Sequence, residues 1–146
     1  MTKRHETRKD RYTNTIRCTD RRHTSEQLYR GSTLESNLLE LVKLRTSQIN
    51  GCSTCVEIHE QDAEAAGVNS RRRKGLSGWT EFPFYNDRER VALGLAELLT
   101  RIPGQKITED IYQLAGEHFD QEDLSTLTTV IHTINNWNSE RNNKTA

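Results

Sequence analysis

Two cysteines separated by two residues, Cys52 and Cys55, are the feature of this sequence with the clearest chemistry. They stand at the expected start of a helix, whose first turn leaves backbone N–H groups pointing toward them. At this spacing two thiols can close a disulfide with little movement of the backbone. His59 follows four residues after Cys55 and seven after Cys52, so all three side chains share one helical face. The pattern indicates thiol–disulfide redox chemistry.

Activation of such a thiol requires more than the start of a helix. A thiol with the ordinary pKa of about 8.5 is about 3% ionised at pH 7, and lowering that pKa by about two units takes roughly 2.7 kcal/mol. A helix N-terminus supplies about 0.3 to 1 kcal/mol, and about 2 kcal/mol at best. His59 can accept the thiol proton or, once protonated, pair with the thiolate. Glu40 lies at the edge of the apolar face of the preceding helix, and we expect it to face the cysteine helix as a proton acceptor.

Two other interpretations of these residues remain open from the spacing alone. Cys52 and Cys55 belong to a residue type that often packs as a small, inert core side chain. Together with His59 they could instead be three ligands of a zinc ion, for which His118, His132 or an acid would supply the fourth. Structural zinc pairs usually sit on turns and recur elsewhere in a chain, so the redox interpretation is preferred.

The chain from residue 34 onward has the apolar periodicity of helices joined by short connections. Helices are expected over about 34–49, 52–66, 70–76, 86–102, 108–119 and 120–138. Asn50-Gly51, Gly67 and Pro103-Gly104 end three of them. In the fifth helix we expect Leu114 to face inward with its apolar neighbours. No stretch alternates convincingly like a strand, so the predicted fold class is all-α, a single-domain bundle of five to six helices.

Several polar residues of these helices have expected structural roles. Asn86 with Glu89 three residues later forms a capping box, and Asp120 caps the last helix. Arg45 lies near the centre of an apolar face, so we expect it to be buried and ion-paired, because an unpaired charge there is expensive. The basic run 71–74 is interpreted as a solvated helix end with cations near the C-terminal dipole.

The N-terminal third differs from the rest in charge and hydropathy. The 146 residues are 32% hydrophobic with zero net charge, against roughly 45 to 50% apolar residues in an ordinary domain. Residues 1–33 hold nine Lys or Arg against four acids, giving +5, and the remainder carries −5. We interpret 1–33 as a polar, basic arm or poorly packed helix, 34–140 as the core domain and 141–146 as a polar tail. Cys18, alone in these polar surroundings, is taken as incidental.

The sequence also indicates compartment and partners. No stretch approaches the 18 or so uninterrupted apolar residues of a membrane helix, and no apolar segment follows the basic start, so we expect a cytoplasmic protein. Three cysteines in that compartment do not build a disulfide framework. Basic residues of the N-terminal segment are interspersed with acids, so neither nucleic acid nor a membrane is an expected partner.

The cysteine segment and its flanks resemble the core of the alkylhydroperoxidase D family, within the carboxymuconolactone decarboxylase-like proteins. The matching residues are Leu39 to Cys52 (LELVKLRTSQINGC), Cys55, His59, Trp79, and the stretches 88–93, 96–100 and 134–138. The resemblance covers about residues 34–138, and the spacing of Glu40 from the cysteines and His59 is its most specific part.

The resemblance implies an all-helical fold that assembles as a homotrimer or homohexamer, and a thiol peroxidase or disulfide reductase activity in antioxidant defence without metal, flavin or other cofactor. Carried over, Glu40 and His59 form a proton relay that generates a thiolate, and Cys52 and Cys55 are the redox pair. Peroxide oxidises one cysteine to sulfenic acid and the other closes a disulfide. We expect Cys55 to be the more exposed, attacking thiol. The partners implied are a hydroperoxide and a dithiol reductant, either a lipoyl or a thioredoxin-like protein.

Three departures from the family pattern limit what is carried over. Ser53-Thr54 replaces the aromatic residue or histidine often found between the cysteines, so no relay through a second histidine is expected. Members that decarboxylate muconolactone usually lack the cysteine pair, which argues against that activity. Residues 1–33 lack the apolar-striped helix of relatives. The alternative function is a non-enzymatic oligomeric module that senses redox state or binds zinc through the same Cys-Cys-His cluster.

Overall fold

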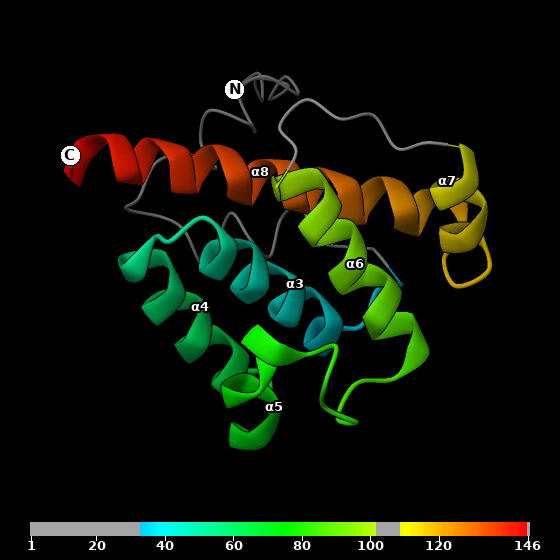
Figure 1. Cartoon of the computed structure of the whole chain (residues 1–146), viewed down its shortest axis with the longest axis horizontal. Coiled ribbons are helices and arrows are strands. Elements are labelled where there is room, and N and C mark those ends of the chain that lie inside the picture. The colour runs from blue at the N-terminus through cyan, green and yellow to red at the C-terminus, as the bar shows by residue number, and fades with distance from the viewer. Residues whose placement is uncertain (1–32, 102–108, 146) are drawn as a thin grey trace, which may run out of the picture.

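The computed structural model describes residues 33–101 and 109–145, and these residues are helical with no β-strand among them (Figure 1). The elements are α3 (Ser36–Ile49), α4 (Ser53–Ala65), α5 (Ser70–Lys74), the 3-10 helix η2 (Leu76–Gly78), α6 (Asp87–Arg101), α7 (Glu109–Gly116) and α8 (Gln121–Thr145). The all-α prediction is confirmed. Two predictions lie outside the described residues: those for residues 1–32, which include Cys18, and the break at Pro103-Gly104. The predicted tail at 141–145 continues α8.

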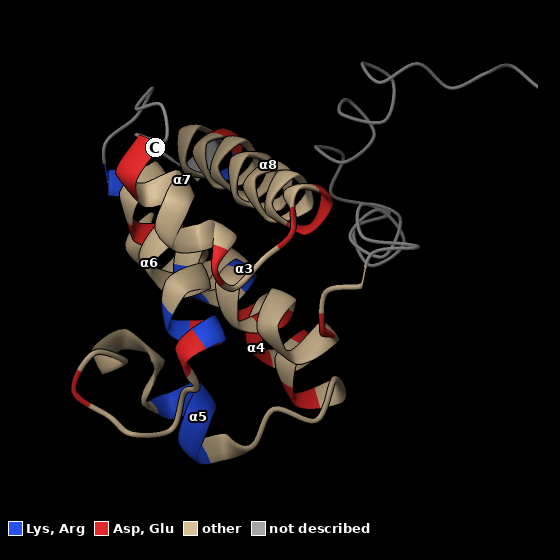
Figure 2. Ribbon diagram, turned by 90° about the vertical axis from the view of Figure 1, so that its right-hand side faces the viewer, with Lys and Arg blue, Asp and Glu red and all other residues tan. Residues whose placement is uncertain are grey.

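Helix α3 is the centre of the fold and contacts α4, α6 and α8 (Figures 1 and 2). Every residue from Leu38 to Ser47 is buried, including the charged Glu40, Lys43 and Arg45. A surface helix buries one stripe, whereas a helix covered on all sides must place every side chain against protein. The charges of α3 therefore find their partners inside the molecule. None of the described helices is long and apolar enough to cross a membrane.

Two apolar clusters pack on opposite faces of α3. The first lies toward α6, α7 and α8, and its fully buried members include Leu39, Val42, Leu127 and Ile131. The second lies toward α4, η2 and the start of α6, and is formed by Leu41, Leu44, Ala63, Val68, Leu76, Tyr85 and Leu93. The predicted inward face of α8, through Trp137 and Asn138, is buried as expected.

The expectation for Leu114 is wrong, because its side chain is 53% exposed. Helix α7 has eight residues and packs against α6 and α8 through a narrow face. Ala115 is the buried residue of that face, and Ile111 packs against the same core. Phe119, which follows the helix, is buried in the same core cluster. Leu114 precedes Ala115 by one residue and therefore projects about 100° away from it.

The predicted turns and caps that fall within the described residues are present. The Glu89 backbone N–H donates to Asn86 Oδ1 at 2.8 Å, and the Asn86 N–H donates to Glu89 Oε1 at 2.9 Å, which is a capping box. Asp120 Oδ1 accepts from the Asp123 N–H at 2.7 Å at the start of α8. Gly67 ends α4 with φ +88°, and Gly51 has φ +65° in the turn before Cys52, conformations that favour glycine.

Arg45 is buried and ion-paired as predicted. Its Nη2 lies 2.9 Å from Glu97 Oε1, which also accepts a hydrogen bond from Trp79 Nε1 at 3.0 Å. Partial burial raises the pKa of Glu97, but the hydrogen bonds from Trp79 and Arg45 and the charges of Arg45 and Arg101 outweigh it and hold the pKa below its ordinary value. This carboxylate ties the loop after η2 to the central helix.

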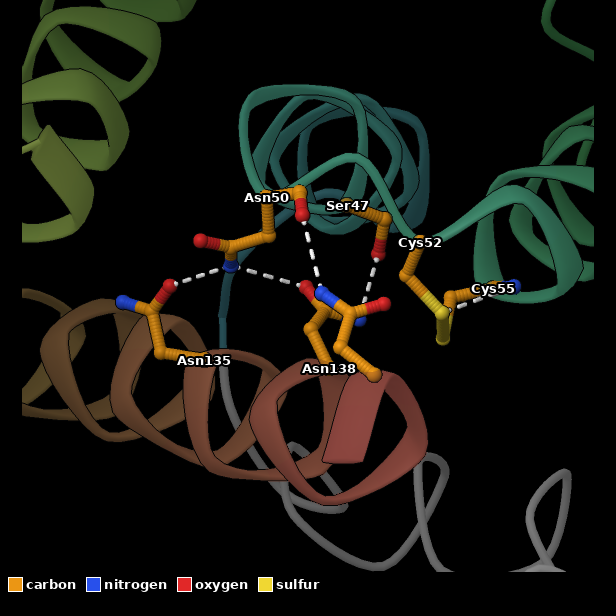
Figure 3. The surroundings of a disulfide bond; sticks show 7 residues. Ser47, Asn50, Cys52, Cys55, Asn135 and Asn138 are labelled. Atoms are coloured by element: carbon orange, nitrogen blue, oxygen red, sulfur yellow. Dashed lines mark hydrogen bonds between the residues drawn. A yellow bond between two sulfur atoms is a disulfide. The ribbon is translucent and has the colours of Figure 1, made fainter. Parts of the chain in front are cut away.

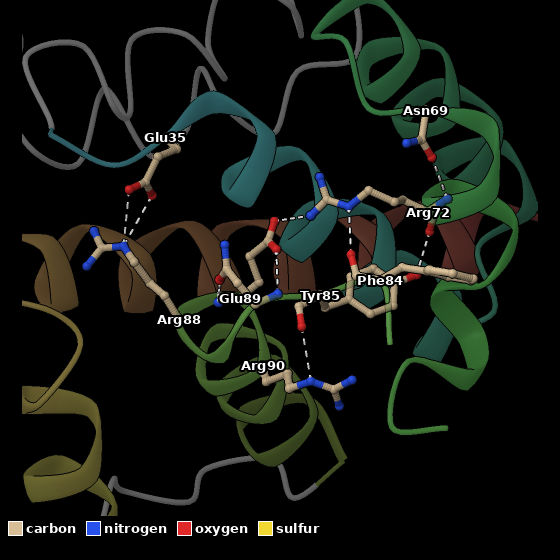
Figure 4. Close-up of polar contacts among 9 residues, drawn as sticks. Glu35, Asn69, Arg72, Phe84, Tyr85, Arg88, Glu89 and Arg90 are labelled. Carbon is tan, nitrogen blue, oxygen red and sulfur yellow. Dashed lines mark hydrogen bonds and ion pairs between the residues drawn. The ribbon is translucent and has the colours of Figure 1, made fainter. Parts of the chain in front are cut away.

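The solvated interpretation of residues 71–74 is wrong for Arg72, which Figure 4 shows, and for Arg73. Arg72 donates through Nε to the Phe84 carbonyl at 3.0 Å and forms an ion pair with Glu89. Arg73 donates to the Val68 carbonyl at 3.0 Å and to Glu60 Oε1 at 2.7 Å. The guanidinium groups of α5 thus bind acceptors from α4 and from the loop before α6. These segments are apart in the sequence, so local sequence patterns do not predict the contacts.

We predict that Glu97→Gln lowers stability and flattens its dependence on acid pH. The folded-state pKa of Glu97 lies below its ordinary 4.5, so its interactions stabilise the fold above that pH, and this stabilisation is lost as the pH falls through the folded pKa. At pH 7 the variant should lose about 1 to 2 kcal/mol of unfolding free energy in urea titrations. The exposed Glu81→Gln is the control, and equal loss in both variants would contradict the assignment.

Candidate redox site

Cys52 and Cys55 form a disulfide at the start of α4 (Figure 3). Their Cα atoms are 5.2 Å apart, and Cys52 is the N-cap residue of the helix. The Cys52 sulfur accepts a hydrogen bond from the Cys55 backbone N–H at 3.4 Å. One orphan donor of the first helical turn is therefore directed at the Cys52 sulfur, where it would favour negative charge.

The expectation that Cys55 is the more exposed cysteine is wrong for this disulfide form. Cys52 is 4% exposed and Cys55 is fully buried. Cys55 lies inside α4 on its inward face, four residues before His59 and eight before Ala63, and these three are the buried residues of the helix. Cys52 precedes the helix as its N-cap residue and lies nearer the protein surface than Cys55. The shared helical face of Cys55 and His59 is confirmed.

His59 is completely buried between α4 and α8. Its imidazole meets the indole ring of Trp137 edge to face, with ring centroids 5.7 Å apart and an interplanar angle of 74°. Trp137 belongs to the stretch of α8 that carries the family resemblance, and the contact gives that residue a place in the site. An aromatic wall of this kind keeps bulk water from the ring and fixes its orientation.

Glu40 of α3, His59 and Asp62 come together between the two helices. At least one nitrogen or oxygen of each lies within 4.8 Å of one in each of the other two. Glu40 therefore faces the cysteine helix as predicted, and the relay role assigned to it with His59 stays a prediction. Asp62 was missed by the sequence analysis. The sequence feature that could have identified it is its position one helical turn after His59 on the same helix.

Lys43 is a second residue that the sequence analysis missed. Its Nζ lies 2.7 Å from Glu40 Oε1, and both side chains are almost fully buried. Such a pair stabilises the ionised carboxylate, because the ammonium charge compensates it where water does not. Carboxylates and a histidine are also metal-ligand types, but the Lys43 ammonium repels a dication. The arrangement is better suited to holding and moving a proton.

The turn that carries Cys52 is fastened to α8 by hydrogen bonds among four asparagines and a serine (Figure 3). Asn50 Nδ2 donates to Asn135 Oδ1 at 2.7 Å and to Asn138 Oδ1 at 3.0 Å. Asn138 Nδ2 donates to Ser47 Oγ at 3.1 Å, and Asn142 Nδ2 donates to the Asn50 carbonyl at 3.0 Å. We call these five residues the asparagine clamp. It sets the position of the disulfide relative to the helix that supplies Trp137.

The histidines considered for a zinc site lie elsewhere. Within the described part of the chain, the metal-ligand types that gather are those of Glu40, His59 and Asp62, without His118, His132 or either cysteine. His132 is exposed on α8, and the two sulfurs are bonded to each other. A cavity of about 600 Å³ lies near the other end of α3, between Glu35, the loop before α6 and Arg88, and neither the cysteines nor His59 line it.

Comparison with known proteins follows the same residues. The family model of the carboxymuconolactone decarboxylase family matches residues 21–98, a range that contains Glu40, both cysteines of the pair and His59. YdfG, an uncharacterized protein of Bacillus subtilis, is 36% identical over 113 residues, which are 77% of each chain. YnjA, an uncharacterized protein of Escherichia coli, is 28% identical over 100 residues, which are 68% of this chain and 54% of YnjA.

The fold has a counterpart among solved structures. A crystal structure from Agrobacterium tumefaciens superposes with a TM-score of 0.71 and 33% sequence identity over 80% of each chain. That protein is described as one of unknown function and as a candidate antioxidant defence protein AhpD.

We predict that Asn138→Ala destabilises the protein by about 1 to 3 kcal/mol, because it removes one hydrogen bond from the part-buried Asn50 amide and one from the buried Ser47 hydroxyl. Urea unfolding of the oxidised protein measures the loss. Asn143→Ala, an exposed asparagine of the same helix, is the control and should change stability by less than about 0.5 kcal/mol. Equal stability of the two variants would contradict the clamp.

Proposed function

We propose that this chain, which belongs to the carboxymuconolactone decarboxylase family and resembles its alkylhydroperoxidase D-like branch, reduces hydroperoxides with Cys52 and Cys55. The observation that carries the proposal is the placement of a disulfide at a helix start, one turn from a buried histidine that has two carboxylates beside it. The antioxidant description of the Agrobacterium protein supports the same class of function.

The site residues divide the chemistry as follows. In the reduced protein, His59 accepts the proton of one thiol, and Glu40, held ionised by Lys43, is the second proton acceptor. The thiolate attacks an oxygen of the hydroperoxide, forming an S–O bond as the O–O bond breaks. The departing alkoxide takes up the proton and leaves as an alcohol. The product on the enzyme is a sulfenic acid.

The second cysteine completes the cycle. Its sulfur attacks the sulfenic acid, an S–S bond forms, and the departing hydroxide leaves with the second thiol proton as water. A dithiol reductant then restores both thiols by exchange and becomes a disulfide itself. A lipoyl or thioredoxin-like protein is the class of reductant we propose. Both sulfurs are buried in a single chain, so the reductant can reach the disulfide only if the turn that carries Cys52 opens locally.

The setting of this activity is part of the same proposal. We place the protein in the cytoplasm and assign it a role in antioxidant defence. Assembly as a homotrimer or homohexamer would complete a core that is lean for the length of the chain, since small helical protomers can bury apolar surface between subunits.

The first prediction of this function concerns thiol consumption and turnover. One equivalent of hydroperoxide should remove two thiols per chain and leave Cys18 reactive. Cys52→Ser and Cys55→Ser should each lower peroxide turnover with a dithiol at least about 100-fold, because neither the disulfide nor its reduction is then possible. Cys18→Ser is the matched control and should keep its activity. Unchanged thiols together with one bound zinc per chain would instead support the zinc-binding module.

The second prediction concerns the relay. His59→Ala and Glu40→Gln should each raise the pH midpoint for alkylation of the reduced pair, by about one to two units for the histidine. Protonated His59 pairs with the thiolate, and Glu40 favours the protonated form of the imidazole. Iodoacetamide reaction rates followed by mass spectrometry between pH 5 and 10 give the midpoint. His132→Ala removes an exposed histidine of α8 and is the control. A midpoint that is the same in His59→Ala and the parent would refute the relay.

A further inference from the structure

Two groups of the proposed relay are shielded from water. His59 is 0% exposed and Glu40 is 5% exposed. A proton that leaves a thiol for this pair is therefore held between α3, α4 and α8. Exchange of that proton with bulk water needs a third group that contacts both the buried pair and the surface.

Asp62 is placed to be that group. It is half-buried, whereas Glu40 and His59 are buried, and it approaches both within 4.8 Å. It lies one turn after His59, on a helix whose outward side carries the exposed acids Glu57 and Glu64. Separations within 4.8 Å allow a proton to pass either through a direct hydrogen bond or through one bridging water.

The charges around His59 give Asp62 a second role. From α3, Glu40 and Lys43 face the site as an ion pair with a 2.7 Å contact, so the ammonium offsets much of the carboxylate charge. From α8, the uncharged ring of Trp137 contacts His59, and the half-buried Glu140 and Arg141 follow one turn later. Asp62 adds a second carboxylate beside the imidazole, and an anion there favours its protonated form.

We propose that Asp62 is a positioning residue of this site, whose carboxylate stabilises protonated His59 and connects the buried Glu40–His59 pair to solvent. The inference rests on the proposed thiolate relay and deepens it. As the S–H bond of a cysteine breaks, its proton passes to the imidazole, and Asp62 exchanges the imidazolium proton with water. The negative charge left on sulfur faces the helix N-terminus and the imidazolium. No oxidant or reductant takes part in this step.

The test measures thiol reactivity in a Cys18→Ser background, so that only Cys52 and Cys55 report. Reduced protein is alkylated with iodoacetamide between pH 5 and 10. Asp62→Asn, which removes the charge and keeps the shape, should raise the midpoint by about one pH unit and slow alkylation about tenfold below the midpoint. Glu64→Gln removes the same charge from an exposed position of the same helix and should leave the profile unchanged. Asp62→Glu should retain most of the parental reactivity.

Three outcomes would overturn the inference. The first is a midpoint in Asp62→Asn equal to that of the parent. The second is an equal shift in Asp62→Asn and Glu64→Gln, which would indicate a general surface-charge effect. The third is an equal loss in Asp62→Asn and Asp62→Glu together with a lower melting temperature, which would indicate a purely structural role. Alkylation requires neither peroxide nor reductant. Failure of the parent to consume peroxide would therefore refute the proposed function, while the alkylation profile would still decide the role of Asp62.

Discussion

Helix α3 is buried along its length from Leu38 to Ser47, and this burial sets the conditions for everything packed around it. A charge in such a position is deprived of water, and leaving it unpaired costs several kcal/mol. Glu40 accordingly pairs with Lys43, and Arg45 pairs with Glu97 of α6. The first pair is satisfied within α3 itself, whereas Arg45 needs a carboxylate from α6, so α6 docks where Glu97 meets it.

The two ion pairs of α3 serve different parts of the molecule. Arg45 and Glu97, with the Trp79 hydrogen bond, hold the loop that joins η2 to α6. Glu40 and Lys43 lie beside α4, where the carboxylate meets a buried histidine. A charge that is expensive in a core becomes useful next to a group that gains and loses protons, because the low local dielectric strengthens its effect on that group.

The cysteine turn is held by polar contacts rather than by apolar packing alone. The asparagine clamp joins Ser47 and Asn50 to three residues of α8, and Cys52 follows directly. The Cα separation of 5.2 Å is that of residues three apart at a helix start, so breaking the S–S bond requires no rearrangement of the backbone. Such a frame suits a bond that is made and broken repeatedly, as the proposed function requires.

The sequence by itself determined the helices, their caps and the common face of Cys55 and His59, because these follow from spacing within one segment. It also located Arg45 in the core, since an apolar face on both sides of an arginine indicates burial. The tertiary structure alone decided that Asn50 meets Asn138, that Arg72 and Arg73 join three segments, and that Asp62 stands beside Glu40. These contacts depend on which faces of separate helices meet, and local spacing carries no information about that choice.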